Sequence, residues 1–116
     1  MSTTIYGIPN CDSVKKARRW LDGKGIDYRF HDVRSDGLDA SQLRSWLEEL
    51  GWETLINRRS SSWKALDLTL REGMDNARAE RCILDTPTLI KRPLLVREDT
   101  TEVGFTPERY TEIFGA

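Results

Sequence analysis

Residues 3–33, TTIYGIPNCDSVKKARRWLDGKGIDYRFHDV, contain the most informative pattern in the chain. β-Branched and aromatic residues predict a short strand that ends at Gly7. Apolar residues then recur at intervals of three and four over 14–21, which is typical of an amphipathic helix, and two glycines mark its end. Apolar and polar residues alternate over 26–33 and predict a second strand. A strand, a helix and a strand within about thirty residues form a βαβ unit with parallel strands.

The rest of the chain predicts helices, then a β-hairpin and a last helix. The apolar spacing over 35–85 is helical. Residues 94–97 and 101–105 predict the two strands of the hairpin. Thr106 followed by Pro107 predicts the start of the last helix, because threonine is a good N-cap and proline suits the first helical position.

These elements predict one four-stranded mixed β-sheet with helices packed against it. The expected fold is α/β (α+β) with a thioredoxin-like architecture, in which a helical insertion at about residues 35–90 separates the second strand from the third. The chain has 116 residues. We expect a single domain over 1–116, since domains of about 100–150 residues are the most common.

Composition and charge exclude several classes of protein. Lysine and arginine total 18 against 19 aspartates and glutamates, whereas nucleic-acid-binding domains are usually strongly basic, so we expect no nucleic-acid partner. No apolar run reaches about eighteen residues and no secretory signal is evident, so we expect no membrane segment. The two cysteines are too few for a disulfide scaffold and show no Cys-x-x-Cys spacing. A cytoplasmic protein without a metal site is therefore expected.

Cys11 is the candidate nucleophile because it lies where the first strand passes into the first helix. Unpaired N–H groups and the positive end of the helix dipole favour the thiolate there, which is the reactive form. Lys15, one turn further along, adds positive charge. A small buried cysteine is the alternative, but polar neighbours such as Asn10 favour a reactive thiol. Val14 stands where Cys-x-x-Cys would need a second cysteine, so an external thiol or Cys82 must resolve the intermediate.

Arginines are the candidate anion-binding residues, since their guanidinium groups bind carboxylates and oxyanions in two-pronged fashion. The candidates are Arg58, Arg59 and Arg92, and for Arg58 alone a solvated surface charge is the better interpretation. Cys82 lies in an apolar helical context and is interpreted as part of the core. His31 is predicted to point outward from the second strand and is given no role.

Three segments carry a resemblance to a known family: IYGIPNC at 5–11, LINRR at 55–59 and IKRPLLV at 90–96. The chain resembles the arsenate reductase (ArsC) and Spx family, most closely its YffB-like branch, over nearly its whole length. The resemblance implies a thioredoxin-like fold with a helical insertion. It also implies a cis bond between Arg92 and Pro93 and a loop at that point that faces the cysteine.

Arsenate reductases of this type use one cysteine, three arginines, and glutathione with glutaredoxin. By resemblance, Cys11 matches the nucleophile and Arg92 the second arginine. The first arginine falls at Asn57, while Arg59 lines up better with the single arginine of Spx and YffB-like members. The third arginine is missing, because Thr106 stands near its place. Losing one bidentate arginine weakens oxyanion binding about tenfold to a hundredfold, so arsenate reduction is not the favoured activity.

The function expected is a single-cysteine, glutathione-linked thiol–disulfide oxidoreductase, an ArsC-like reductase. Its expected site has two catalytic and four substrate-binding residues: Cys11 and Arg92, and Asn10, Lys15, Arg59 and Pro93. We expect no bound cofactor, glutathione as co-substrate, glutaredoxin as a further partner, and an anionic small molecule or a disulfide as substrate.

Two alternatives belong to other classes. One is glutaredoxin-dependent arsenate reduction. The other is a non-enzymatic, Spx-like regulator that binds RNA polymerase. Spx senses oxidation through Cys-x-x-Cys, which Cys11 and Val14 cannot supply, so this alternative is restricted to polymerase binding without a redox switch.

Overall fold

The computed structural model describes residues 2–98 and 100–115. Contacts group the chain into two compact units, one formed by Met1–Asp32 with Arg92–Ala116 and the other by Val33–Lys91. We call them the sheet unit and the helical unit. The single domain expected over 1–116 stays a prediction, which coincident unfolding of the two units would confirm.

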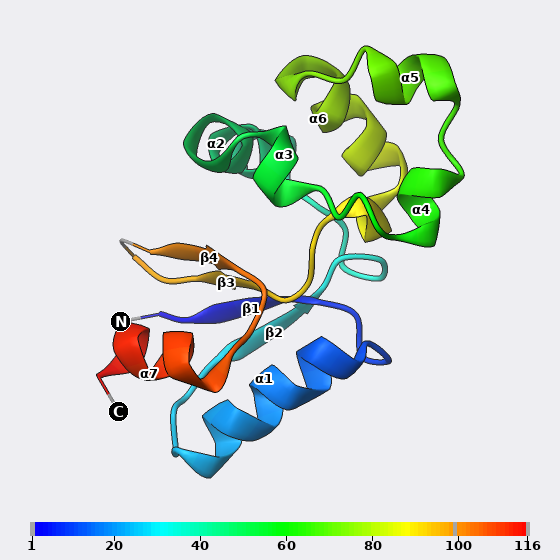
Figure 1. Ribbon diagram of the computed structural model, residues 1–116. Coiled ribbons are helices and arrows are strands. Elements are labelled where there is room, and N and C mark those ends of the chain that lie inside the picture. The colour runs from blue at the N-terminus through cyan, green and yellow to red at the C-terminus, as the bar shows by residue number, and fades with distance from the viewer. Residues whose placement is uncertain (1, 99, 116) are drawn as a thin grey trace. The chain divides into compact units, whose positions relative to one another are not determined.

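The sheet unit carries β1 (Thr4–Gly7), α1 (Asp12–Gly23), β2 (Arg29–Asp32), β3 (Leu94–Val96), β4 (Thr101–Val103) and α7 (Pro107–Phe114) (Figure 1). The strand order is β2-β1-β3-β4. β1 runs parallel to β2 and antiparallel to β3, and β4 is antiparallel to β3. This mixed sheet, with its βαβ start and hairpin end, confirms the predicted thioredoxin-like fold.

The second strand is shorter than the predicted range of 26–33. It covers Arg29–Asp32, because β1 offers only four residues for pairing. The residues before it complete the end of α1, where Ile26 donates its N–H to the carbonyl of Leu21 at 3.0 Å. Gly25, with φ of 68°, supplies the left-handed turn that this path needs.

α1 and α7 cover one face of the sheet (Figure 1). Ile5 of β1 and Leu95 of β3 are paired in register on that face. They pack with Ala17, Leu21 and Tyr110 into a cluster that has no exposed surface. Half-buried aromatic and aliphatic side chains surround this cluster: Trp20, Ile26, Tyr28, Phe30, Phe105, Ile113 and Phe114. The core of the sheet unit therefore combines residues from the N-terminal part of the chain, in β1 and α1, with residues from its C-terminal part, in β3 and α7.

His31 alternates with Phe30, which packs against the core cluster, but His31 is half-buried rather than fully exposed. It is paired in register with Tyr6 across β1 and β2, and the two ring centroids lie 4.7 Å apart. The imidazole is half-buried and the tyrosine is buried. Apolar contact with an aromatic neighbour explains why a histidine is accommodated at this position of the sheet.

The hydroxyl of Tyr110 is buried without a hydrogen-bond partner in the part of the chain that the structure describes. Burial raises the pKa of this phenol, and the carboxylate of Glu102 raises it further. Replacing Tyr110 by phenylalanine is expected to raise the free energy of unfolding by about 1 kcal/mol, since an unsatisfied buried hydroxyl is costly. Denaturant unfolding measures the change. Tyr110→Leu is the control: it also loses the edge-on contacts with Trp20 and Phe105 and should destabilise. A less stable phenylalanine variant would contradict this prediction.

The helical unit carries α2 (Ala40–Leu50), α3 (Trp52–Leu55), α4 (Ser61–Lys64), α5 (Leu68–Glu72), α6 (Asn76–Asp85) and the 3-10 helix η1 (Pro87–Leu89). It lies between β2 and β3 in the chain, which confirms the predicted helical insertion. Gly51, with φ of 81°, ends α2 and precedes α3. The core of the helical unit is built from buried side chains of these short helices: Leu43, Trp46, Leu47, Leu55, Trp63, Ala79, Ile83 and Leu89.

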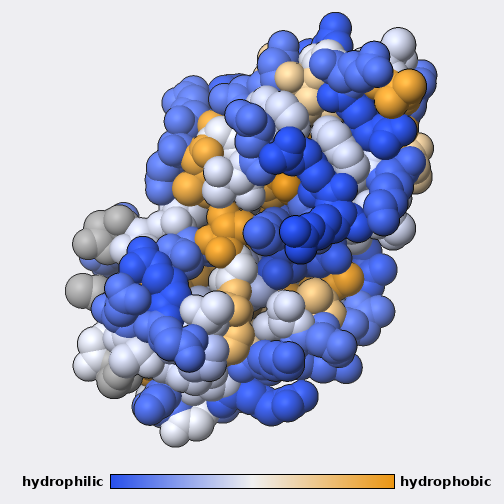
Figure 2. Space-filling view, in the orientation of Figure 1, coloured by the Kyte–Doolittle hydropathy of each residue, from blue (hydrophilic) through white to orange (hydrophobic). Residues whose placement is uncertain are grey.

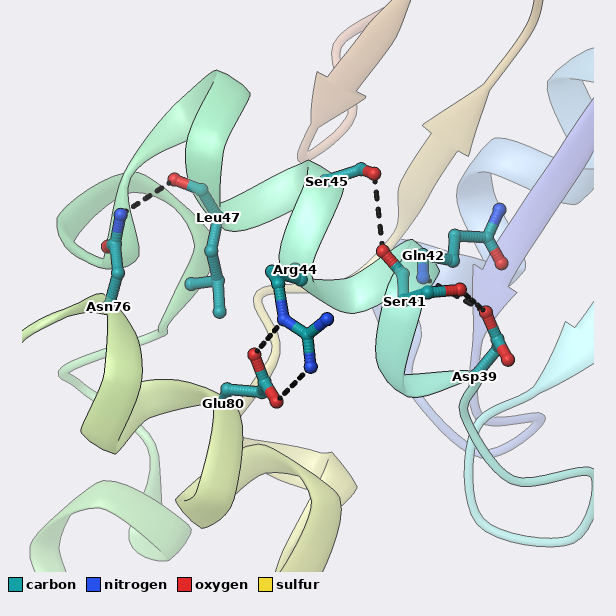
Figure 3. Close-up of polar contacts among 8 residues, drawn as sticks. All are labelled: Asp39, Ser41, Gln42, Arg44, Ser45, Leu47, Asn76 and Glu80. Atoms are coloured by element: carbon teal, nitrogen blue, oxygen red, sulfur yellow. Dashed lines mark hydrogen bonds and ion pairs between the residues drawn. The ribbon is translucent and has the colours of Figure 1, made fainter.

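Polar side chains tie α2 to α6 (Figure 3). Arg44 donates from Nε and Nη2 to the two carboxylate oxygens of Glu80, at 2.9 and 3.0 Å. Asn76 donates from Nδ2 to the carbonyl of Leu47 at 3.1 Å. At the other end of α2, the carboxylate of Asp39 accepts a backbone N–H of the first turn, as a good N-cap does. These bonds fix the arrangement of α2 and α6 within the unit.

Hydrophilic residues cover most of the face shown in Figure 2, with hydrophobic residues in smaller groups among them. Large hydrophobic side chains that stay exposed among the described residues include Leu68, Leu70 and Leu84. No helix in residues 2–98 and 100–115 is both long enough and apolar enough to span a membrane.

Candidate active site

Cys11 is the N-cap residue of α1. Its backbone is extended, with φ of −97° and ψ of 127°, and its side chain makes no capping hydrogen bond within the described residues. Its carbonyl accepts the N–H of Lys15 at 2.9 Å, so the preceding N–H groups of the first turn have no helical carbonyl to bind. Cys11 is half-buried, and its thiol is not part of a disulfide. The side chain of Cys11 lies at the positive end of the helix dipole.

The close approach of α1 to the end of β1 depends on Gly7. A Cβ atom at this position would lie 2.6 Å from Cγ2 of Val14 and 3.3 Å from Cγ1. Val14 belongs to the first turn of α1 and is completely buried. The missing side chain of Gly7 therefore lets the turn that carries Cys11 pack against the sheet. The local sequence marks this glycine only as the end of a strand, because a tertiary contact has no local signal.

The peptide bond between Arg92 and Pro93 is cis, as the family resemblance implied. Pro93 is buried and directly precedes β3. The register pairs Tyr6 of β1 with Leu94 of β3. The last residues of β1 and the first residues of β3 therefore lie at the same end of the sheet, measured along the strands. α1 begins beyond that end (Figure 1). Two segments far apart in the sequence, the Cys11 loop and the cis-proline loop, are thus positioned at one end of the sheet unit.

The other predicted residues of the sheet unit differ in exposure. Asn10 and Lys15 are exposed on either side of Cys11 in the chain. Arg92 is half-buried, and its Nε atom is shielded from solvent. The exposed pair offers polar groups to a ligand near the thiol, while Arg92 is followed directly by the buried Pro93.

Arg59 belongs to the helical unit, where it is exposed in a turn. Its N–H donates to Oδ1 of Asn57 at 3.0 Å. An antiparallel bridge between Ile56 and Ile90 sets this turn beside the segment that runs into Arg92 in the chain. Its part in the site stays a prediction.

The profile of the ArsC family matches residues 6–113. The chain belongs to the ArsC family. It is similar to the solved structure of a YFFB protein, with 40% identity, a TM-score of 0.91 and coverage of 96% of this chain and 97% of that one. An arsenate reductase (ArsC) related protein from Brucella melitensis is 45% identical, with a TM-score of 0.79 and coverage of 100% and 97%. The global transcriptional regulator Spx 1 of Bacillus cereus is 30% identical over 104 residues, which are 88% of this chain and 79% of the regulator. The family resemblance predicted from sequence is confirmed.

Thr106 stands near the place of the third arginine of arsenate-reducing members. Its Oγ1 accepts the N–H of Arg109 at 3.1 Å and caps α7, with Pro107 at the first helical position. The predicted helix start is confirmed. In this ArsC-family chain, therefore, the residue stabilises a helix end and supplies no positive charge for an oxyanion.

Cys82 is half-buried on α6 rather than fully in the core. Burial raises the pKa of its thiol, an effect that Arg81 offsets only in part. Less thiolate is thus present at neutral pH. We expect iodoacetamide to modify Cys11 at least about tenfold faster than Cys82 at pH 7, and the rate at Cys82 to rise only above the usual thiol range near about pH 8.5. Peptide mass mapping across pH measures both rates. Equal rates, or faster modification of Cys82, would contradict this prediction.

Proposed function

We propose that this protein is a single-cysteine, glutathione-linked thiol–disulfide oxidoreductase of the cytoplasm. The observation that supports it best is the free thiol of Cys11 at the N-cap of α1, a half-buried side chain that makes no capping bond in the described chain. An N-cap side chain normally satisfies the free N–H groups of its own helix. A cysteine in this place instead presents its sulfur to an external electrophile, with those N–H groups near the charge that develops.

The proposed cycle is two successive thiol–disulfide exchanges. The Cys11 thiolate attacks one sulfur of a disulfide, the S–S bond breaks, and the other half leaves as a thiolate. The half of the substrate that Cys11 attacked is now bound to Cys11 in a mixed disulfide. The thiolate of glutathione attacks the sulfur of that half, which restores the Cys11 thiolate and leaves the same half joined to glutathione. A second glutathione, directly or through glutaredoxin, releases that half. Two glutathione molecules are oxidised for each disulfide reduced.

Each predicted site residue has a role in this proposal. Arg92 holds a carboxylate of glutathione or an anionic group of the substrate beside the sulfur, and Arg59 is proposed to bind the same anionic group. Pro93 shapes the loop that faces the thiol. Asn10 and the first N–H groups of α1 stabilise the developing negative charge, and Lys15 adds a positive charge one turn away.

A coupled assay tests this function. The protein is supplied with glutathione, glutathione reductase, NADPH and bis(2-hydroxyethyl) disulfide, and NADPH oxidation is followed. We expect a rate proportional to protein concentration that disappears after alkylation of Cys11. A rate equal to that of the protein-free mixture, over a range of disulfide concentrations, would overturn the proposal.

Arsenate reduction is the second candidate, and the name of the similar Brucella melitensis protein favours it. The cap role of Thr106 counts against it, because one oxyanion contact is missing. The same assay with glutaredoxin, and with arsenate in place of the disulfide, separates the two activities. Arsenate-dependent oxidation that exceeds the disulfide rate would reverse their order.

An Spx-like role is the third candidate, which the similarity to Spx 1 supports. It requires binding to RNA polymerase and no chemistry at Cys11. A pull-down of purified polymerase by wild type and by Cys11→Ser, with equal recovery by both, together with a negative glutathione assay, would place this role first.

A further inference from the structure

A groove lies between α1 and the segment that leads into α7. It encloses about 610 Å³ and is lined by Lys16, Arg19 and Trp20 of α1, by Phe105, and by the start of α7. All of these residues belong to the sheet unit. Sites for small organic molecules typically occupy about 300–1,000 Å³ and combine aromatic walls with a few charged groups. We call this cavity the α1–α7 groove.

The groove is separate from the thiol. Trp20 follows Cys11 by about two and a half turns of a helix with about 3.6 residues per turn, so the two residues lie on opposite sides of α1. They are roughly 13 Å apart along the helix axis, at about 1.5 Å per residue. The described residues that line the groove do not include Cys11. A molecule bound in the groove therefore leaves the thiol uncovered.

The aromatic walls of the groove are held by the core. Trp20 and Phe105 both meet the ring of Tyr110 edge-on, with centroids 5.6 and 4.7 Å away. Tyr110 has no exposed surface, so the two walls are anchored to the same buried ring. Trp20 and Phe105 are themselves only half-buried. A ligand that enters finds its apolar contacts already in place, which lowers the entropic cost of binding.

The charges at the groove are not neutralised within the protein. Lys16 and Arg19 contribute two positive charges, and Glu108 contributes one negative charge. All three residues are exposed, and none of them forms an ion pair within residues 2–98 and 100–115. Lys24 adds a further positive charge, because its Nζ atom lies 5.7 Å from the ring centroid of Trp20. Net positive charge beside aromatic walls is complementary to an aromatic carboxylate.

We propose that the α1–α7 groove is a second binding site, which takes a small aromatic carboxylate without any covalent bond to the protein. The ring of the ligand packs against Trp20 and Phe105, and its carboxylate lies beside Lys16 and Arg19. This site goes beyond the proposed function and does not depend on chemistry at Cys11.

The first experiment compares two probes of the same shape in NMR titrations of the full chain. One is 2-naphthoate, which is anionic, and the other is 2-naphthamide, which is uncharged. We expect 2-naphthoate to shift the signal of the Trp20 indole N–H in a saturable way and to bind more tightly than the amide by about two- to fivefold. The variant Trp20→Phe identifies the signal. A Trp20 signal that does not respond, or equal affinities for the two probes, would overturn the proposal.

Charge variants of the groove should act in opposite directions. Lys16→Gln and Arg19→Gln should each weaken the binding of 2-naphthoate about two- to fivefold, whereas Glu108→Gln should tighten it by a similar factor. The affinity for 2-naphthamide should stay within about 1.5-fold in all three variants, because the walls are unchanged. Lys64→Gln is the matched control, since it removes a positive charge from an exposed position in the helical unit. Equal effects of the groove variants and the control would contradict a site in the groove.

The last experiment tests whether the groove and the thiol are separate sites. Cys11→Ser should bind 2-naphthoate as tightly as wild type, and saturating 2-naphthoate should leave the rate of Cys11 alkylation by iodoacetamide within about twofold. Protection of Cys11 by the ligand would overturn a site separate from the thiol. None of these measurements uses glutathione, so a failed glutathione assay would overturn the proposed function alone.

Discussion

Cys11→Ser is expected to reduce glutathione-dependent disulfide reduction to the uncatalysed rate, a loss of about a thousandfold or more. A serine hydroxyl cannot form the mixed disulfide that the cycle requires, so no slower version of the same route remains. Steady-state NADPH oxidation in the coupled assay measures the loss. Activity retained in this variant would rule out Cys11 as the nucleophile.

The same variant should keep its fold, which separates a chemical effect from a structural one. The side chain of Cys11 makes no capping bond in the described chain, and serine is among the best N-cap residues. We therefore expect Cys11→Ser to be as stable as wild type or more stable by up to about 1 kcal/mol. Cys82→Ser is the matched control. If it retains activity, glutathione alone resolves the intermediate, whereas a loss would identify Cys82 as the resolving thiol.

The fold was predictable from sequence where local patterns and tertiary packing agree. The helix over 14–21 and the strand before it follow from residue spacing alone. The range predicted for the second strand, 26–33, is too long, because Ile26 and Tyr28 alternate with polar residues without being part of the strand. They pack at the edge of the core cluster without pairing with β1. Alternation reports which side chains are buried, and only pairing makes a strand.

Only part of the candidate site could be predicted from the sequence. Cys11 is marked by a turn followed by a helix start, both of which are local features. The contact between Gly7 and Val14, which sets the first turn of α1 against the sheet, has no such signal, because it arises from tertiary packing. The role proposed for Arg59 also depends on tertiary structure, since Arg59 and Cys11 belong to different units. When a site is built from several segments, the sequence predicts only those site residues that a local pattern in their own segment identifies.

Gly7→Ala is expected to destabilise the protein by about 1–3 kcal/mol, because a methyl group would be forced against a completely buried valine. The nearest atom would be Cγ2 of Val14 at 2.6 Å, and a β-branched side chain in a helix has little freedom to rotate away. The first turn of α1 would have to move off the sheet and carry Cys11 with it. We therefore expect the rate of Cys11 alkylation to change together with stability.

Two further variants make this test specific. Gly23→Ala is the control, since a Cβ atom at Gly23 would meet nothing within 4 Å in the described structure, and it should change stability by no more than about 0.5 kcal/mol or stabilise slightly. Val14→Ala removes the two methyl groups that the new side chain would strike. The double variant Gly7→Ala/Val14→Ala should therefore be more stable than the sum of the single changes predicts. Denaturant unfolding of the four proteins of this cycle gives the coupling energy. If the two changes are additive, or if Gly7→Ala is as stable as wild type, then the position of Cys11 does not depend on the contact between Gly7 and Val14.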